Sequence, residues 1–413
     1  MNKIISRCSI YGNISAPTSK SMMIRALIIS LLNKETTEIT YNSLCNDVVS
    51  TIEIIEKLGA KITKIEKCLK ITGGFSEGIL KIDCKESLLA VRLFSIIASL
   101  HDEKTTITGD DKLLNRTVYL PEESLESLGV KIETNNNKIP IKIKGPIKSG
   151  KIEIDGSTTS QILTGLLMTL PLAESDSEIK VNNLKSLPYI DMTICLLNEF
   201  GIRILNQNYT LFKIPGKQTY KHTKYTVEGD WSSAAFLLVA GAIGGKVTVK
   251  NLDVFTRQAD KMIIDALHRA NAKLSINSDM ISAEKNNLEA FQFDANSCPD
   301  IFPPLVALAA HCNGTSLIRG VNRLFAKDSN RVQRLKDVFT KLGIEINIDD
   351  DIMLITGGPI KSTTIDCFND HRIAMAVAVA AIDSEGEVTI ENAECVAKSY
   401  VEFWDDLDSL IKK

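Results

Sequence analysis

Hydrophobic and polar positions along this chain follow a pattern that returns every 70 to 72 residues. In each return, an amphipathic helix-like segment ends and a strand-like segment follows, at Leu58, Leu128, Phe200, Ala270 and Leu342. Short strands rich in β-branched residues keep a similar interval, centred on Ile39, Ile107, Ile179, Val247, Leu317 and Val388. Self-similarity at a fixed period indicates repeated supersecondary units that need neighbours to bury their apolar faces. Six units of this size predict globular lobes rather than a rod.

Each repeat is predicted to contain two kinds of helix between its strands. The first kind is apolar and rich in small residues, and it occupies 21–32, 87–100, 160–173, 232–245, 301–314 and 371–383. Helices of this composition are buried on nearly all sides. The second kind is amphipathic, as in 48–59, and lies nearer the surface. Gly59, Gly129, Gly201 and Gly343, with Asn271 in the fourth repeat, stand where a left-handed residue ends a helix. The fold class is therefore α/β.

Composition narrows the classes of partner. The chain of 413 residues has a formal net charge of −3, and its 24% charged residues are evenly mixed without a long Lys/Arg run. Nucleic acid and anionic membranes are therefore not favoured as partners. Nine cysteines without a C-x-x-C pair indicate reduced, buried thiols and a cytoplasmic protein. Metal-ligand spacing, a P-loop and dinucleotide motifs do not occur, so we expect no metal and no cofactor.

Polar residues gather where the six apolar helices begin. Helix N-termini favour anions, and cations there oppose the helix dipole unless an anionic ligand is bound. Such cations occur at Lys20, Arg25 and Arg372. Further cations precede the amphipathic helices, at Arg116, Lys327, Arg331 and Lys398. A single one would be a solvated surface charge. Seven at equivalent positions of a repeated fold predict a convergent site for phosphate or carboxylate.

Several serines and carboxylates at these helix starts have two interpretations. Ser87, Ser232 and Ser233 are predicted to be N-caps. Asp300 is either a cap or a carboxylate that moves a proton amid the cations, and Asp328 is either half of a surface ion pair or a proton-transfer group. The pattern as a whole suits a cofactor-free reaction on a phosphorylated acid.

At these residues the chain resembles the 5-enolpyruvylshikimate-3-phosphate synthase (3-phosphoshikimate 1-carboxyvinyltransferase) family of enolpyruvyl transferases. The likeness covers essentially the whole chain and rests on 19–27, 157–168, 186–193, 227–236, 298–310, 326–331, 368–376 and 397–400. It implies a two-lobed inside-out α/β barrel of six βαβαββ repeats, three per lobe. One lobe would be 16–228, mainly on the shikimate 3-phosphate side, and the other 1–15 with 229–413, with the active site in the cleft between them.

The resemblance implies transfer of the enolpyruvyl group of phosphoenolpyruvate to the 5-hydroxyl of shikimate 3-phosphate by addition and elimination. This is a step of the shikimate pathway and of aromatic amino-acid biosynthesis, performed by a cytoplasmic monomer. It implies phosphoenolpyruvate ligands at Lys20, Arg116, Gln161, Arg331, Arg372 and Lys398. It implies shikimate 3-phosphate ligands at Lys20, Ser21, Arg25, Thr159, Ser160, Gln161, Ser186, Asp300 and Lys327. Asp300 would take the hydroxyl proton, and Asp328 with Lys20 would manage the proton at the methylene carbon.

Two departures from the family pattern bear on the site. Leu88 stands where the family has a glycine that lets the backbone approach phosphoenolpyruvate. Glyphosate occupies that site in the family, so we expect Leu88 to make this chain poorly sensitive to it. Asp328 stands where members carry Glu, and its carboxylate would sit about one methylene back.

Two alternatives remain at this point. One is the enolpyruvyl transferase that acts on UDP-N-acetylglucosamine. That family usually carries a cysteine, and sometimes an aspartate, just before the arginine equivalent to Arg116. Residues 109–116 contain Asp110 and Asp111 but no cysteine, and segments 186–193 and 326–331 favour the 5-enolpyruvylshikimate-3-phosphate synthase family. The other is a diverged, non-catalytic homologue that binds a phosphorylated metabolite. Leu88, Leu89 and Asp328 favour it, whereas the retained cations oppose it.

Overall fold

The computed structural model describes residues 1–221, 224–325, 327 and 330–412. The chain divides into two compact units, which we call the central unit, Lys20–Val227, and the terminal unit, Met1–Ser19 with Glu228–Lys413. These divisions lie within four residues of the predicted ones, at 15/16 and 228/229. Near them, Thr18 and Gly229 form an antiparallel bridge, and the Ser19 N–H donates to the Glu228 carbonyl at 2.9 Å. The two segments that leave the terminal unit are therefore hydrogen-bonded to each other.

The sheets of the central unit have the strand orders β14-β3-β5-β4, β6-β7-β9-β8 and β10-β11-β13-β12. Their strands are β3 (Thr36–Thr40), β4 (Lys61–Ile65), β5 (Cys68–Thr72), β6 (Leu80–Asp83), β7 (Thr105–Thr108), β8 (Lys131–Glu133), β9 (Ile141–Lys144), β10 (Lys151–Asp155), β11 (Ser177–Asn182), β12 (Leu205–Gln207), β13 (Leu211–Ile214) and β14 (Lys224–Thr226). Its helices are α1 (Lys20–Leu32), α2 (Asn46–Leu58), α3 (Leu88–Ile97), α4 (Asp111–Leu114), α5 (Glu122–Ser127), α6 (Gln161–Thr169) and α7 (Leu187–Glu199).

The terminal unit repeats this design with β2-β15-β17-β16 and β18-β19-β21-β20, and adds the smaller sheet β1-β23-β22. Its strands are β1 (Lys3–Ile5), β2 (Ile10–Ser15), β15 (Gly245–Lys250), β16 (Lys273–Ile276), β17 (Met280–Glu284), β18 (Gln292–Asp294), β19 (Thr315–Arg319), β20 (Glu345–Asp349), β21 (Ile352–Thr356), β22 (Thr363–Asp366) and β23 (Val388–Glu391). Its helices are α8 (Trp231–Gly244), α9 (Ile263–Arg269), α10 (Phe302–Ala310), α11 (Arg331–Lys341), α12 (His371–Ala380) and α13 (Phe403–Leu410).

Strand direction follows one rule in the four-stranded sheets. The first two strands run parallel, as β6 and β7 do with Ile82 opposite Ile107. The third and fourth form an antiparallel hairpin that pairs with the second, as β8 and β9 do beside β7. A parallel pair needs a crossover between its strands. The apolar helices α3, α6 and α10 supply it for β6–β7, β10–β11 and β18–β19, so the predicted βαβαββ unit is confirmed in these three sheets. In the pairs β14–β3 and β2–β15, the two strands come from distant parts of the chain.

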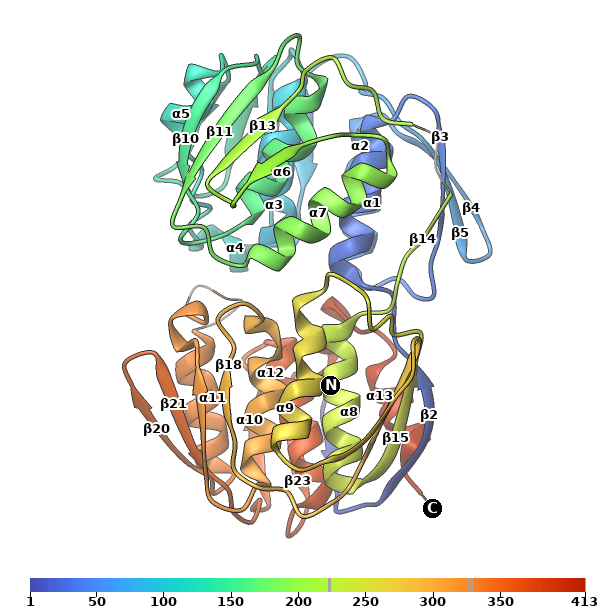
Figure 1. The fold of residues 1–413 in the computed structure, drawn as a ribbon, viewed down its shortest axis with the longest axis vertical. Helices are drawn as coiled ribbons and strands as arrows, with labels where there is room; N and C mark the ends of the chain where they lie inside the picture. The colour runs from blue at the N-terminus through green and yellow to red at the C-terminus, as the bar shows by residue number, and fades with distance from the viewer. Residues whose placement is uncertain (222–223, 326, 328–329, 413) are drawn as a thin grey trace. The chain divides into compact units, whose positions relative to one another are not determined.

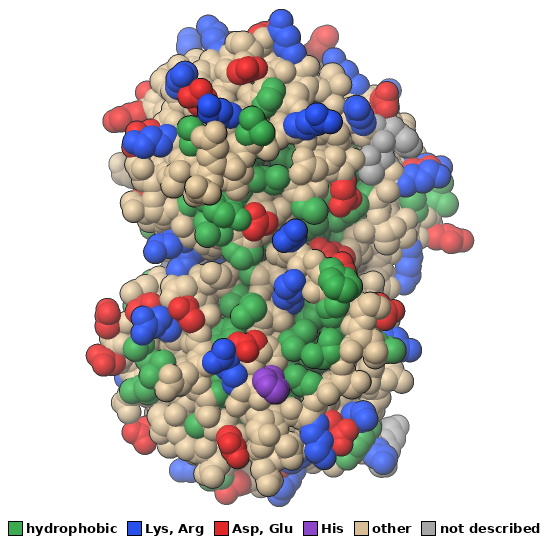
Figure 2. All heavy atoms as spheres, in the orientation of Figure 1, with side chains coloured by type: hydrophobic (Ala, Val, Ile, Leu, Met, Phe, Trp, Pro, Cys, Tyr) green, Lys and Arg blue, Asp and Glu red, His purple; other side chains and the backbone are tan. Residues whose placement is uncertain are grey.

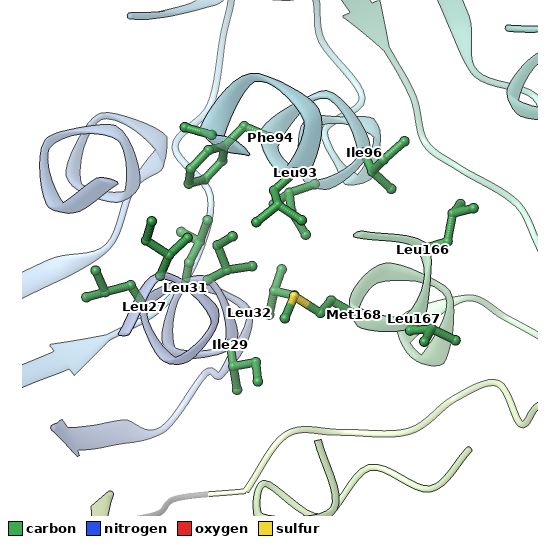
Figure 3. Packing of buried hydrophobic residues seen from close by; sticks show 14 of the residues in the cluster. Leu27, Ile29, Leu31, Leu32, Leu93, Phe94, Ile96, Leu166, Leu167 and Met168 are labelled. Carbon is green, nitrogen blue, oxygen red and sulfur yellow. The ribbon is translucent and has the colours of Figure 1, made fainter. Parts of the chain in front are cut away.

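The apolar helices lie inside each unit, with sheets outside them (Figure 1). Every residue of α10 is buried, and so is every residue of α12. In the central unit, side chains such as Leu31 of α1, Leu93 of α3 and Met168 of α6 fill the space between the three helices (Figure 3). Burying such a side chain contributes about 1.5–3 kcal/mol, so this layer is a main source of stability. It also fixes the directions of the helix starts that carry the candidate site.

The strands predicted around Ile39, Ile107, Ile179, Val247, Leu317 and Val388 are confirmed as β3, β7, β11, β15, β19 and β23. The helix-ending glycines and Asn271 all have positive φ, from 63° to 126°. One strand starts later than predicted. After Phe200, the Arg203 N–H donates to the side chain of Gln218 at 2.8 Å, so ladder pairing begins only at Leu205.

The sixth repeat departs from the others. Its sheet has three strands, and β1 from the chain's start pairs antiparallel with β23, with Ile4 opposite Thr389. The strand that a hairpin supplies elsewhere is therefore supplied by the N-terminus, and the chain continues from β23 into α13. Sequence periodicity could not predict this pairing, because the two strands are separated by nearly the whole chain.

The cysteines are all free thiols, but the prediction that all are buried is wrong. Cys195 is exposed, and Cys8 and Cys68 are partly exposed. Cys195 follows the period of α7 onto its outer face, where the amphipathic helix contacts solvent.

The surface mixes both signs of charge. On the face drawn in Figure 2, Lys and Arg side chains are interspersed with Asp and Glu over both units. Exposed ion pairs such as Lys180–Glu153, at 3.1 Å, contribute about 1 kcal/mol or less each. Among the described residues, no helix is both long enough and apolar enough to cross a membrane.

Candidate active site

The terminal unit contains a compact cluster of charges around Asp300. Asp300 lies in a short 3-10 turn, Pro299–Ile301, just before α10. Its Oδ1 accepts from Lys327 Nζ at 3.0 Å, and its Oδ2 lies 3.4 Å from Arg372 Nη2. Arg331 Nη1 is 3.9 Å from Oδ1. The structure therefore brings together four of the predicted site residues. The cap positions of this turn and of α10 are occupied by Cys298 and Ile301 rather than Asp300, so of its two interpretations the carboxylate among cations agrees with the geometry.

Asp370 extends this cluster. Its carboxylate accepts from Arg331 Nε at Oδ2 and from Arg331 Nη2 at Oδ1, both at 3.0 Å. Its Oδ1 also accepts from the Arg372 backbone N–H at 3.0 Å, which makes Asp370 the N-cap of α12. Asp370 is fully buried and Arg331 is 1% exposed. Because a buried ion pair persists only with good geometry and satisfied hydrogen bonds, Asp370 fixes both the Arg331 guanidinium and the start of α12.

Three cations and two carboxylates leave this cluster with an excess of positive charge. Burial alone would raise the pKa of the Asp300 carboxyl, but Arg372, Lys327 and Arg331 hold it well below its usual value. Burial lowers the pKa of Lys327, and Asp300 opposes that shift. Asp300 is therefore an ionised acceptor, and the cations beside it can still attract an anion.

Two further predicted site residues belong to the terminal unit, Lys398 and Asp328. Lys398 ends the 3-10 segment Ala393–Lys398, which packs against α12, and its side chain is partly buried. Asp328, predicted to act at the methylene carbon, lies outside the described residues.

In the central unit, α1 carries Lys20, Ser21 and Arg25 in its first two turns. Lys20 Nζ donates to Asp47 of α2 at 3.0 Å, and its side chain is 15% exposed. Arg25 is 2% exposed. Its Nε donates to Thr193 Oγ1 at 3.0 Å and its Nη1 to the Ser21 carbonyl at 2.8 Å. Burial lowers the pKa of Arg25 to about 10, so it remains a cation at neutral pH. Arg25 therefore anchors α1 to α7 while placing positive charge beside Ser21.

The segment before α6 carries Thr159, Ser160 and Gln161. Thr159 Oγ1 accepts from the Gln161 N–H at 3.2 Å, which satisfies one of the donors at the start of α6. Gln161 Oε1 accepts from Arg92 Nη1 at 2.9 Å. Ser186 stands before α7 with φ of 56°, a left-handed conformation that is uncommon for serine. Strained residues of this kind concentrate at ligand sites.

Arg116 follows α4 in the loop that leads to α5, and its N–H donates to the Leu113 carbonyl at 3.0 Å. Arg92 of α3 fixes the same loop by donating to the Val118 carbonyl at 3.0 Å. Positive charge on Arg116 contributes to a lowered pKa of Arg92, about 10, for which burial is the main cause. The two guanidinium groups are thus close enough to interact.

Leu88, the departure from the family glycine, is the first residue of α3. It is 7% exposed and belongs to the core of the central unit.

Ser87 caps α3 by accepting from the Ala90 N–H at 3.3 Å, as predicted. At α8 the prediction is wrong, because Asp230 accepts from the Ser233 N–H at 2.7 Å and is the cap. Ser232 instead donates to the carboxylate of Asp260.

Sequence reasoning missed the residues that hold the site in place, namely Asp47, Arg92, Asp260 and Asp370. One signal was available for Arg92, because a lone cation in an otherwise apolar helix is almost never buried without partners. Asp260 is 4% exposed, and its Oδ1 is a buried atom without a hydrogen-bond partner in the described residues. Burial raises the pKa of Asp260 to about 7, and the charge of Asp300 adds to this rise.

Both units therefore present cations at helix starts, which suits ligands with phosphate and carboxylate groups. Within the described residues, no group of three or more His, Cys, Asp or Glu side chains could hold a metal ion. Asp300 has three cations within 4.0 Å of its carboxylate, and that arrangement can accept a proton from a hydroxyl group beside bound anions.

Comparison with known proteins identifies the family. The family model for EPSP synthase (3-phosphoshikimate 1-carboxyvinyltransferase) matches residues 6–407. A 3-phosphoshikimate 1-carboxyvinyltransferase of Clostridium acetobutylicum is 37% identical over 98% of this chain and 96% of its own length. A 3-phosphoshikimate 1-carboxyvinyltransferase of Clostridium perfringens is 36% identical over 98% of this chain and 97% of its own length.

A solved structure of EPSP synthase from Acinetobacter baumannii shares the fold, with a TM-score of 0.84 and 23% identity over 99% of this chain and 98% of that one. The family match excludes the first alternative considered above, the family that acts on UDP-N-acetylglucosamine. Matched over nearly its whole length, the chain belongs to the EPSP synthase (3-phosphoshikimate 1-carboxyvinyltransferase) family.

Proposed function

We propose that this chain is an enzyme that transfers the enolpyruvyl group of phosphoenolpyruvate to the 5-hydroxyl of shikimate 3-phosphate and releases phosphate. This is the enolpyruvyl transfer step of the shikimate pathway. The observation that carries the proposal is the Asp300 carboxylate, kept ionised by Lys327, Arg331 and Arg372, in a chain of this family.

The binding roles follow from charge. Both substrates carry a phosphate and a carboxylate, so the site needs cations and donors that offset their mutual repulsion. We assign phosphoenolpyruvate to Lys20, Arg116, Gln161, Arg331, Arg372 and Lys398. We assign shikimate 3-phosphate to Lys20, Ser21, Arg25, Thr159, Ser160, Gln161, Ser186, Asp300 and Lys327. In this assignment, most contacts to shikimate 3-phosphate come from residues of the central unit.

The proton roles follow from the order of bond changes. In the addition step, the 5-hydroxyl oxygen bonds to C2 of phosphoenolpyruvate, the hydroxyl proton passes to Asp300, and the methylene carbon gains a proton whose transfer we assign to Asp328 with Lys20. In the elimination step, the methyl carbon returns that proton to the same residues, the double bond re-forms, and the C2–O bond to phosphate breaks. The leaving phosphate takes the proton that Asp300 holds, which restores the carboxylate. Cations of the site stabilise the charge on the departing phosphate.

The direct test measures phosphate released from phosphoenolpyruvate by purified protein, with and without shikimate 3-phosphate. Lys20→Met tests the site, and Lys34→Met is its matched control, because Lys34 is an exposed lysine just beyond α1. We expect release that requires shikimate 3-phosphate, persists in the control and falls at least about a hundredfold in Lys20→Met.

The opposing result would be binding of shikimate 3-phosphate without any release of phosphate. That outcome would support the non-catalytic homologue, the second alternative, and would point to Leu88 and Asp328 as the changes that ended turnover. Release that is unchanged in Lys20→Met would instead reject the assigned site while leaving the activity standing.

The enzyme's state in the cell completes the proposal. We infer a cytoplasmic monomer with no nucleic-acid or membrane partner. The free cysteines and the mixed surface charge support this inference. Light scattering on the eluted protein would contradict it by giving the mass of a dimer rather than 45.4 kDa.

A further inference from the structure

Arg92 is a buried arginine to which neither the family resemblance nor the composition assigns a role. It lies in the middle of α3, among Leu, Phe, Ile and Val side chains, and is 6% exposed. Each of its three nitrogen atoms donates one hydrogen bond. Nε donates to the Val118 carbonyl at 3.0 Å and Nη2 to the Thr117 carbonyl at 3.4 Å. Nη1 donates to Gln161 Oε1 at 2.9 Å. Burying a cation costs several kcal/mol, so a position held this way invites a functional explanation.

The bond to Gln161 determines what that side chain can offer a ligand. An amide carries an acceptor oxygen and a nitrogen with two donors, and rotation by half a turn exchanges them. A guanidinium can only donate, so Arg92 must face the oxygen. The Gln161 Nε2 is thereby directed away from Arg92 with its donors available. Without Arg92, either end could face the ligand, and the oxygen would repel a phosphate or carboxylate.

The bonds to Thr117 and Val118 act on a second predicted ligand. These two residues directly follow Arg116 in the loop between α4 and α5. Their carbonyls are fixed to α3 through Arg92, and the Tyr119 ring lies over the same guanidinium, 5.8 Å from its carbon. Asn137 holds the same loop from another side, because its carbonyl accepts from the Val118 N–H at 2.8 Å. Arg92 is the anchor that ties the loop to α3, and the direction in which Arg116 leaves the loop depends in part on it.

We propose that Arg92 is a positioning residue for phosphoenolpyruvate, holding the Gln161 amide with its donors toward the ligand and fixing the loop that carries Arg116. The proposal rests on the proposed function, because it takes Gln161 and Arg116 as ligands of that substrate. Arg92 itself touches neither substrate. Its positive charge adds to the attraction for an anion, but its main effect is to prevent the wrong amide orientation.

The test is a double-mutant cycle between Arg92 and Gln161. Arg92→Met keeps the length of the side chain and removes the donors, and Gln161→Leu removes the amide. Both single variants and the double variant are measured for the KM of each substrate, for kcat, and for the Kd of phosphoenolpyruvate in the presence of shikimate 3-phosphate. We expect Arg92→Met alone to raise the KM and Kd for phosphoenolpyruvate roughly tenfold or more, and those for shikimate 3-phosphate by less.

When Gln161→Leu is already present, Arg92→Met should raise the Kd for phosphoenolpyruvate by only about threefold. This remaining effect is the one that Arg92 exerts on the loop carrying Arg116. Arg92→Lys keeps one donor group and should recover part of the loss. It also serves as the measured variant if Arg92→Met does not fold. Leu27→Ala is the matched control, because Leu27 is a buried core residue of the same unit to which no ligand role is assigned. It should lower the melting temperature and leave the Kd unchanged.

Additive effects of Arg92→Met and Gln161→Leu would overturn the proposal, as would an unchanged Kd with a lowered melting temperature. Failure of the proposed function is recognised separately. It appears as wild-type protein that releases no phosphate, whereas the role of Arg92 is read from binding, which does not require turnover. Wild-type protein that binds no phosphoenolpyruvate at all would reject both.

Discussion

Asp370 and Arg331 form a buried ion pair joined by two hydrogen bonds, each 3.0 Å long. The pair connects the start of α11 to the start of α12, and both helix starts carry predicted phosphoenolpyruvate ligands. The geometry is bidentate, so it fixes the plane of the guanidinium as well as its position. The remaining Nη1 of Arg331 lies toward Asp300, at 3.9 Å from Oδ1. Asp370 thus determines where the charge of Arg331 acts.

We predict that Asp370→Asn weakens both stability and substrate binding. It leaves the Arg331 cation buried with a neutral partner, which costs about 3 kcal/mol of unfolding free energy. The KM for phosphoenolpyruvate should rise at least tenfold, since hydrogen bonds to charged groups are worth about 1.5–3 kcal/mol. Urea unfolding and steady-state kinetics measure the two effects. Asp337→Asn is the control, because Asp337 pairs with Arg334 at 4.0 Å on the exposed side of α11. Equal effects of both substitutions would contradict the role assigned to Asp370.

Asp300 gives a prediction about catalysis. Asp300→Asn keeps the size of the side chain and removes the proton acceptor, so kcat should fall about 10²- to 10⁴-fold. Binding of shikimate 3-phosphate should persist, because an amide retains one acceptor for Lys327. Calorimetric titration with shikimate 3-phosphate and a phosphate-release assay separate the two. A kcat within about threefold of wild type would exclude Asp300 as the base.

The cations around Asp300 give a prediction about pH. They hold the pKa of its carboxyl well below the usual value, so Asp300 loses its charge only in strong acid. Lys327→Met removes the nearest cation, and the pKa of Asp300 should therefore rise. The acid limb of the pH profile of kcat/KM should move to higher pH in this variant, whatever the loss in absolute rate. An acid limb at the same pH in both proteins would mean that another group controls it.

The repeated elements could be predicted from the sequence, and so could the charged residues that the structure brings together around Asp300, but not the contacts that orient them. Strand and helix positions follow from local periodicity, so β7 was found from the residues around Ile107 alone. The three-stranded sheet of the sixth repeat depends on pairing between Ile4 and Thr389, which no local pattern contains.

The same limit applies within the site. Arg372 was predicted from its place at a helix start, whereas Asp370, two residues before it, was assigned no role. Its function depends on Arg331, 39 residues earlier in the chain. Arg92 donates a hydrogen bond to Gln161, which is 69 residues later in the sequence, and only the packing of α3 against α6 brings the two side chains together. Positioning residues are therefore hard to predict, because their partners are set by tertiary structure.

Leu88 gives a prediction about inhibition. It stands where the family has glycine, and its side chain is 7% exposed at the start of α3. We predict that Leu88→Gly increases inhibition by glyphosate, because the backbone there would be open to the inhibitor. The substitution should also cost about 3–5 kcal/mol of stability through lost packing and added chain entropy. Inhibition curves against phosphoenolpyruvate measure the first effect. Leu27→Ala is the control, because it removes a different buried side chain of the core, and it should leave inhibition unchanged. Unchanged inhibition in Leu88→Gly would reject the prediction.

Asp260 gives a prediction about the pH dependence of stability. Burial raises the pKa of its carboxyl to about 7, so between roughly pH 4 and pH 7 the folded protein retains a proton that the unfolded chain has lost. The folded state then binds more protons, and the free energy of unfolding must fall as pH rises through this window. Asp260→Asn removes the titrating group while keeping an acceptor for Ser232 Oγ. The drop in unfolding free energy between about pH 5 and pH 8, measured by urea titration, should be smaller in this variant. A drop of the same size in both proteins would mean that Asp260 is already ionised at low pH, with Arg372 supplying the compensating charge.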